Sequence, residues 1–232
     1  MLPQNRLQNT LVFIPVYNEE HTIASVITHV RSFIPNANIL IVDDGSTDRS
    51  QAVARSLNVK IIHHASNLGV GATLNSAVSY ALSKNYQSLL QLDGDGQHQL
   101  SLELISSLEE SRHAVLTIGN RFHRNSIYSM SRTRKLAIVF LRFLIYVKFR
   151  IRLKDPTSGF RFFKREALAA LKDNIQTEYL QDTVHVIKYL AENGYMIDEV
   201  NSIFKAREHG ESSFRKLSLI KAYLLSVILF LF

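Results

Sequence analysis

Two aspartates separated by one residue, Asp93 and Asp95, directly follow the apolar run 88–92. If this run is a strand, both side chains project to the same side, because residues i and i+2 of an extended backbone share a face. Two carboxylates so placed can bind one hard cation such as Mg²⁺ or Mn²⁺, which would in turn hold a diphosphate. The alternative is an ordinary turn, since Asp and Gly are common turn residues.

The elements that would position this pair are predicted by hydrophobic patterning. Residues 10–16 form an unbroken apolar run, as expected of a buried parallel strand, and 19–33 has apolar residues at helical spacing. Further strands are expected at 39–42, 59–62, 87–92 and 114–118, and further helices at 46–57, 71–82 and 101–109. Repeated strand–helix units predict a Rossmann-like α/β fold, in which helices flank a mainly parallel sheet.

Polar or glycine-rich residues follow each of the first four predicted strands, in the segments 15–20, 42–48, 67–72 and 93–98. Ligands of such sheets bind at the carboxyl ends of the strands. Turns explain the glycines, but turns do not need acids at three of these four positions. We therefore expect this edge of the sheet to bind a cation together with a neutral polar group, such as a sugar or a base.

Composition and motif searches exclude several classes of protein. The chain of 232 residues has no cysteine, which excludes disulfides, thiolate zinc sites and cysteine nucleophiles. The sequence Gly69-Val70-Gly71 lacks the third glycine of a dinucleotide fingerprint, and no Walker A sequence is present. The segment that starts at Asp93 lacks the glycine and glutamate of a calcium loop. No secretory signal is visible at the N-terminus.

The net charge of +7 is concentrated between Arg121 and Lys154, where no acidic residue occurs. Such a block attracts nucleic acid, anionic lipid headgroups or phosphorylated substrates. The segment 136–149 within it is too apolar for a typical nucleic-acid helix, and charges interrupt it too soon for a comfortable membrane span. A basic, aromatic-rich helix lying in a membrane interface fits better. The alternative is a core helix whose Arg142 and Lys148 snorkel to water.

The C-terminal segment 215–232 also indicates a membrane. It is mostly apolar, yet its uncharged part from Ala222 is shorter than the roughly 20 residues of a membrane-spanning helix. So much apolar surface would be a liability in water. We expect one catalytic-type domain, residues 1–214, followed by an apolar helix that dips into lipid or packs on a partner. The protein would lie at the cytoplasmic face of a membrane, peripheral or C-terminally anchored.

Several of these blocks together resemble family 2 glycosyltransferases with the A-type fold. The matching blocks are 14–20, 42–48, 92–98, 119–122, 155–161 and Arg207-x-x-Gly210-x-Ser212. The likeness covers roughly residues 10–214 in the right order, which makes it more specific than any single motif. It is greatest for the branch that contains dolichyl- and polyprenyl-phosphate sugar synthases.

The resemblance implies metal-dependent transfer of a sugar from a nucleotide-sugar donor, with inversion and without a covalent enzyme intermediate. The residues that it assigns to the nucleotide sugar are Pro15, Tyr17, Glu19, Asp44 and Asp93. Asp93 and Asp95 would bind Mg²⁺ or Mn²⁺, with Gln97 as a further oxygen ligand. The cation would neutralise the leaving nucleoside diphosphate, so that Asp95 is a catalytic residue.

Two kinds of acceptor are compatible with the resemblance. A sugar hydroxyl needs a general base, and Asp182 matches the family's position, although Gln181 replaces the usual preceding Glu. A phosphate monoester, with a second pKa of about 6, needs cationic steering instead. Arg121, Arg134 and Arg207 match arginines of the lipid-phosphate branch, and guanidinium suits phosphate. With the apolar basic helix and tail, this favours a polyprenyl-phosphate acceptor.

One departure from that branch keeps alternatives open, since Ser213 and Phe214 follow Ser212 where the branch usually has Lys. The chain could instead act on a hydroxyl of a surface polysaccharide or lipid-linked glycan, with Asp182 as the base. It could also be a non-catalytic nucleotide-sugar-binding partner, which the retained aspartates argue against. Nucleic-acid binding is disfavoured by the apolar character of the basic block.

Overall fold

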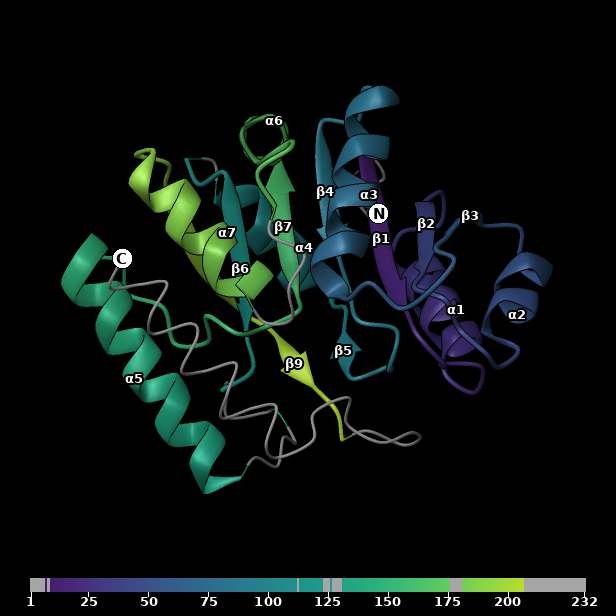
Figure 1. The fold of residues 1–232 in the computed structure, drawn as a ribbon, viewed down its shortest axis with the longest axis horizontal. Helices are drawn as coiled ribbons and strands as arrows, with labels where there is room; N and C mark the ends of the chain where they lie inside the picture. Colours follow the sequence, from purple (N-terminus) through teal and green to yellow (C-terminus); the bar gives the residue numbers. More distant parts are fainter. Residues whose placement is uncertain are drawn as a thin grey trace.

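The structure is a computed structural model that describes residues 7, 9–111, 113–122, 126, 131–175 and 181–206. A seven-stranded sheet with the order β3-β2-β1-β4-β7-β6-β8 runs through the centre of the molecule (Figure 1). Its strands are β1 (Thr10–Val16), β2 (Asn38–Asp43), β3 (Lys60–His63), β4 (Ser88–Gln91), β6 (Leu116–Asn120), β7 (Arg161–Lys164) and β8 (Ile197–Asn201).

Strand direction divides this sheet into two parallel groups. β1 pairs in parallel with β2 and β4, β2 pairs in parallel with β3, and β6 pairs in parallel with β8. β7 lies between β4 and β6 and runs antiparallel to both. The sheet is therefore mixed and mostly parallel, as the patterning predicted, with one reversed strand that it did not predict.

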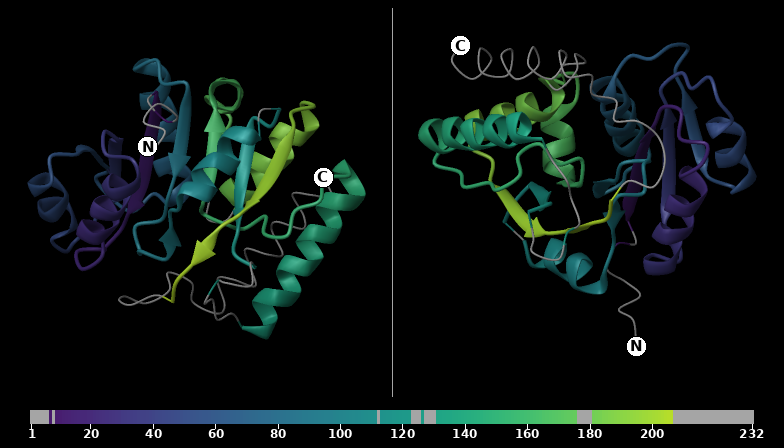
Figure 2. Two further views of the ribbon diagram at one scale, coloured as in Figure 1. Left: turned by 180° about the vertical axis from the view of Figure 1, so that it is seen from behind. Right: turned by 90° about the horizontal axis from the view of Figure 1, so that it is seen from below.

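Helices cover both faces of the sheet (Figure 2). One face carries α3 (Val70–Ser83), α5 (Arg132–Phe149), α6 (Arg165–Leu171) and α7 (Gln181–Glu192), and the other carries α1 (Ile23–Phe33), α2 (Ser50–Ser56) and α4 (Leu102–Glu110). Successive residues of β1 serve the two layers in turn: Phe13 packs with α3, whereas Ile14 packs with α1. This double burial explains why β1 is apolar throughout.

A second, two-stranded sheet lies at the carboxyl edge of β4. β5 (His98–Gln99) follows the Asp93–Asp95 loop and pairs antiparallel with β9 (Ile203–Phe204), near the end of the described chain (Figure 1). Backbone hydrogen bonds extend the pairing, because the Lys205 N–H donates to the Gln97 carbonyl at 2.9 Å. Segments separated by about a hundred residues thus meet beside the candidate cation ligands.

The basic apolar segment forms α5, which is capped at its N-terminus by Ser131, whose hydroxyl accepts the Arg134 N–H. One face of α5 is buried against the molecule through Ile138, Leu141 and Ile145. Its remaining large apolar side chains are exposed: Leu136, Val139, Phe140, Phe143 and Val147. Among the described helices, none has the length and hydrophobicity needed to span a membrane. Residues 215–232 lie outside the described part, so that the expected C-terminal helix stays a prediction.

Candidate active site

The strand-end residues predicted from the sequence meet at one edge of the sheet. β1 lies between β2 and β4, and the Asp44 N–H donates to the Val16 carbonyl at 2.8 Å while the Leu92 N–H donates to the Phe13 carbonyl at 3.0 Å. The chains that leave these three parallel strands therefore leave side by side. This places the segments after β1, β2 and β4 around a common edge, as expected for a ligand site.

The segment 92–97, which connects β4 to β5, is called the β4 loop. Asp93 is its more accessible carboxylate, with 38% of its side chain exposed. Its Oδ2 lies 2.8 Å from Nε2 of His98. Burial opposes ionisation of Asp93, but His98, Arg121 and Arg161 outweigh it and hold the pKa of this carboxyl below its usual value. Asp93 is therefore an anion at neutral pH.

Gly159 allows a second loop to pack directly on Asp93. A Cβ atom at position 159 would overlap both carboxylate oxygens of Asp93. A close approach of this kind requires a residue without a side chain. The loop before β7 therefore closes one side of the carboxylate.

Asp95 and Gln97 complete the loop. Asp95 is only 8% exposed, and its Oδ1 accepts the Gln97 N–H at 3.1 Å. Nε2 of Gln97 donates to the Lys205 carbonyl at 3.1 Å, and none of the described residues donates to its Oε1. Between the aspartates, the Gly94 carbonyl accepts the Thr22 hydroxyl at 2.8 Å, which fastens the loop to the start of α1.

The chain after β1 contributes an exposed aromatic ring and a held carboxylate. Tyr17 is exposed, and Pro15 is the partly buried residue before Val16, the last residue of β1. The Glu19 backbone N–H donates to the Ser50 hydroxyl at 2.7 Å. The side-chain Oε2 of Glu19 accepts the Thr22 hydroxyl at 2.8 Å. These bonds tie the first block to α2 and α1, so that Tyr17 faces outward at the edge predicted to bind the nucleotide.

Asp44 is enclosed by protein donors. Its carboxylate accepts the backbone N–H groups of Leu68 at 3.0 Å and Gly69 at 2.7 Å, and lies 2.7 Å from Nδ1 of His64. His64 in turn contacts the Ser76 hydroxyl at 2.9 Å. Asp44 thus holds the loop that leads into α3, and its contact with the nucleotide stays a prediction. The sequence favoured a surface or packed role for the pair His63-His64, and His64, which directly follows β3, is indeed partly buried against Asp44.

Arg121, predicted to bind the acceptor phosphate, lies in a buried ion pair. Its Nε and Nη2 donate to the two oxygens of Asp155 at 2.5 Å and 2.8 Å, and Nη2 also reaches the Thr157 hydroxyl. Oε1 of Glu199 accepts the backbone N–H groups of Lys154 and Asp155. The Arg121–Asp155 ion pair and Glu199 together hold the loop 154–157 in place. The contact of Arg121 with a phosphate stays a prediction.

The other predicted acceptor residues are only partly described. Arg134 lies in the first turn of α5, and its backbone N–H donates to the Ser131 hydroxyl. Asp182 is the second residue of α7, and its side chain is outside the described part. Arg207 lies beyond the described residues.

Arg161 is a functional candidate that sequence reasoning missed. It is 2% exposed, and its guanidinium donates to the carbonyls of Ser158 and Pro156 at 3.0 Å and 3.3 Å. Its charge also helps to lower the pKa of Asp93. The signal was present, because Arg161 ends the block 155–161 that resembles the family.

The residues of the β4 loop fit a hard divalent cation. Within the described ranges, no group of three or more His, Cys, Asp or Glu side chains is arranged around a common point. The available donors are instead two carboxylates and an amide oxygen, which with water and substrate oxygens suit Mg²⁺ or Mn²⁺. Asp93 is ionised, and none of the described residues donates to its Oδ1.

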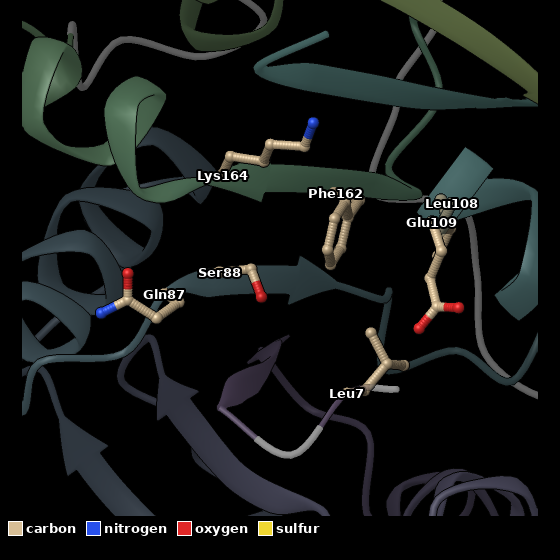
Figure 3. A pocket seen from close by; sticks show the side chains of 7 residues that line it. All are labelled: Leu7, Gln87, Ser88, Leu108, Glu109, Phe162 and Lys164. Carbon is tan, nitrogen blue, oxygen red and sulfur yellow. The ribbon is translucent and has the colours of Figure 1, made fainter. Parts of the chain in front are cut away.

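A cavity of about 420 Å³ lies at the opposite edge of the sheet (Figure 3). It is lined by Leu7, Gln87, Ser88, Leu108, Glu109, Phe162 and Lys164. Ser88 begins β4, and Lys164 ends the antiparallel β7, so both mark the amino edge of the parallel strands. None of the predicted site residues lines this cavity.

The mixed sheet and the loops at its carboxyl edge have the architecture of the A-type glycosyltransferase fold. Mannosyl-3-phosphoglycerate synthase from Rubrobacter xylanophilus superposes with a TM-score of 0.72 at 15% identity, over 97% of this chain and 74% of that one. Glucosyl-3-phosphoglycerate synthase from Mycobacterium tuberculosis, solved with Mn²⁺, UDP-glucose and phosphoglyceric acid, gives a TM-score of 0.68 at 22% identity, over 96% and 78%. At these identities the likeness establishes the fold.

The chain belongs to glycosyltransferase family 2. The model of this family, described as Glycosyl transferase family 2, matches residues 11–172. Polyprenol monophosphomannose synthase from Mycolicibacterium smegmatis is 30% identical over 220 residues, which cover 88% of this chain and 80% of the relative. Undecaprenyl-phosphate mannosyltransferase from Micrococcus luteus is 28% identical over 209 residues, covering 87% and 86%. The predicted family and the enzyme class are thus confirmed.

Proposed function

We propose that this glycosyltransferase moves a sugar from a nucleoside diphosphate sugar to a polyprenyl phosphate at a membrane surface, with inversion at the anomeric carbon. The observation that carries the proposal is the β4 loop. It presents two carboxylates, one of them ionised and accessible, at the edge where the chains after β1 and β2 also emerge. Two relatives, a polyprenol monophosphomannose synthase and an undecaprenyl-phosphate mannosyltransferase, support the acceptor.

On the donor side, the roles follow from position. Asp93, Asp95 and Gln97 would hold Mg²⁺ or Mn²⁺, which supplies charge neutralisation for the leaving diphosphate. Tyr17, which is exposed after β1, would face the nucleotide. Glu19, two residues further along the chain, is held by the Thr22 hydroxyl. Direct attack by the acceptor on the anomeric carbon needs no nucleophile from the protein.

On the acceptor side, a phosphate monoester is largely ionised at neutral pH and attacks without a general base. Arg134 and Arg207 would pair with its oxygens. The exposed apolar side chains of α5 support a lipid surface next to them, because Leu136 and Phe143 are 71% and 59% exposed on a helix that also carries Arg132 and Lys135. Apolar and basic side chains on one helix suit the interface of an anionic membrane.

A second candidate acceptor is a sugar hydroxyl of a polysaccharide or lipid-linked glycan. The observation that favours it is the Arg121–Asp155 pair, because it occupies one of the three arginines expected to bind a phosphate. In that case Asp182, at the start of α7, would act as the general base.

The test is to incubate the purified protein and Mn²⁺ with UDP- and GDP-sugars and a polyprenyl phosphate, and to identify products by mass spectrometry. We expect a sugar-bearing lipid phosphate that requires metal and is absent with Asp95→Asn. Donor turnover without a lipid product would instead support the hydroxyl acceptor. Nucleotide binding without any turnover would contradict the enzymatic proposal.

A further inference from the structure

His98 is a buried histidine that none of the roles above includes. Only 3% of its side chain is exposed, although the residue lies in the small sheet β5–β9 and not in the central sheet. Its Nε2 lies 2.8 Å from Oδ2 of Asp93. Its Nδ1 is buried and has no hydrogen-bond partner in the described part of the chain. Among the described residues, the polar contact of the imidazole is the candidate cation ligand Asp93.

Two aromatic rings hold the imidazole in place. Phe160 stacks on it at a centroid distance of 5.9 Å, and Phe204 packs against it at 4.4 Å. Phe160 belongs to the loop whose Gly159 touches Asp93, and Phe204 belongs to β9. The ring is thus wedged between two distant segments, so that its rotation and its withdrawal from Asp93 are both hindered.

The hydrogen bond decides which oxygen of Asp93 faces outward. The carboxylate accepts the Nε2–H at Oδ2, and no described residue donates to Oδ1. A carboxylate fixed at one oxygen binds a cation through the other, and hydrogen-bonding partners of ligands commonly set ligand orientation and metal affinity. Gln97 is held in a similar way. Its Nε2–H donates to the Lys205 carbonyl, and its Oε1 could coordinate a cation.

We propose that His98 is a positioning residue for the cation site, which fixes Oδ2 of Asp93 and directs Oδ1 to the metal, and that β9 holds His98 through Phe204. The inference rests on the proposed function only in that it assumes a cation on the β4 loop. It connects that loop to the segment 203–205, which leads toward Arg207.

Three substitutions test this role. His98→Phe keeps a ring between Phe160 and Phe204 but removes the donor. His98→Gln keeps an amide N–H near the position of Nε2, whereas the shorter His98→Asn places its N–H near the position of Nδ1. His113→Phe is the matched control, since His113 is exposed and outside the site. Thermal unfolding identifies any variant that fails to fold.

The primary readout is binding of Mn²⁺ alone, and Mn²⁺ with UDP, followed by the electron paramagnetic resonance signal of free Mn²⁺. We expect His98→Phe and His98→Asn to weaken Mn²⁺ binding by roughly 10–100-fold, and His98→Gln to restore most of it. In transfer assays, saturating Mn²⁺ should recover much of the kcat of His98→Phe. Mn²⁺ binding as tight as in the wild type for His98→Phe and His98→Asn would overturn the inference.

The outcomes separate this inference from the proposed function. If His98→Phe does not fold, equal Mn²⁺ affinities of the Gln and Asn variants overturn the role of the N–H donor. A wild type that binds Mn²⁺ in a His98-dependent manner but transfers no sugar to lipid phosphate overturns the proposed acceptor alone. Absence of saturable Mn²⁺ binding by the wild type overturns both the cation site and the role of His98.

Discussion

The carboxylates at this edge of the sheet differ in how many hydrogen bonds they accept from described residues. The Asp43 oxygens accept the Ser46 N–H and contact His63, and Asp44 accepts two backbone N–H groups beside His64. Asp93 contacts His98 through Oδ2, and none of the described residues donates to its Oδ1. The acids after β2 therefore build the loops, whereas the acids after β4 are the ones suited to bind a cation.

Asp95→Asn removes one negative charge while preserving side-chain shape. We expect transfer to fall by about 100-fold or more, because the leaving diphosphate loses its neutralisation. The midpoint of thermal unfolding should change little. Asp173→Asn is the control, since Asp173 is exposed and has a positive φ that Asn also adopts readily. Full activity with unchanged metal dependence in Asp95→Asn would exclude the assigned role.

Arg121→Met tests whether this arginine is structural. Because the change leaves the buried Asp155 without its partner, we expect the free energy of unfolding in urea to fall by about 3–5 kcal/mol. Arg132→Met, at an exposed position, should have little effect. Unchanged stability together with a raised KM for the lipid phosphate would instead identify Arg121 as an acceptor ligand.

At the scale of elements, α5 has two apolar faces, of which only one packs against other described residues. We expect the double substitution Leu136→Glu and Phe143→Glu to weaken binding to anionic vesicles by at least tenfold, because each buried apolar side chain contributes about 1.5–3 kcal/mol. Co-sedimentation measures the loss. Met196→Glu is the control, since Met196 is 61% exposed and directly precedes β8. Equal binding of all variants would remove α5 from the membrane contact.

The junction of β8 with the loop 154–155 is predicted to be sensitive to pH. Burial and the nearby charge of Asp155 raise the pKa of Glu199 above its usual 4.5, although hydrogen bonds from two backbone N–H groups oppose the rise. A raised pKa in the folded state means that Glu199 stabilises the fold below about pH 4.5 and that this contribution is lost as the pH rises through its folded pKa.

Glu199→Gln should therefore gain stability relative to the wild type between pH 4.5 and pH 7, since glutamine still accepts both N–H groups without a charge. Urea unfolding at the two pH values measures the difference. The exposed Glu110→Gln provides the comparison. A constant difference between Glu199→Gln and the wild type across this range would contradict the raised pKa.

Over the whole molecule, the sequence predicted the parallel half of the sheet better than the rest. The strand at 10–16 is confirmed to the residue, and the strands at β2, β3 and β4 lie within two residues of their predicted bounds. β7, β8 and β9 have two to five residues each and mixed polarity, as in Arg161–Lys164. Their pairing depends on distant partners, so local patterning did not reveal them.

The site was predictable where chemistry follows a strand end directly. The acids of the β2 and β4 loops and the exposed Tyr17 meet at one edge, because parallel strands bring their ends together. The partners that hold them, His64, His98 and Arg161, come from other strands and loops. Only three-dimensional packing shows that a given histidine faces a given carboxylate.

The reversed strand β7 has a consequence for synthesis of the chain on the ribosome. β1 to β4 are complete by Gln91, but the partner that covers the free edge of β4 is β7, which begins only at Arg161. Until then the nascent sheet exposes the unpaired backbone groups along one side of β4, which are a template for pairing with other chains. A fragment cut between α4 and β7 should therefore self-associate, so the half proposed to bind the nucleotide is not expected to fold as a separate module.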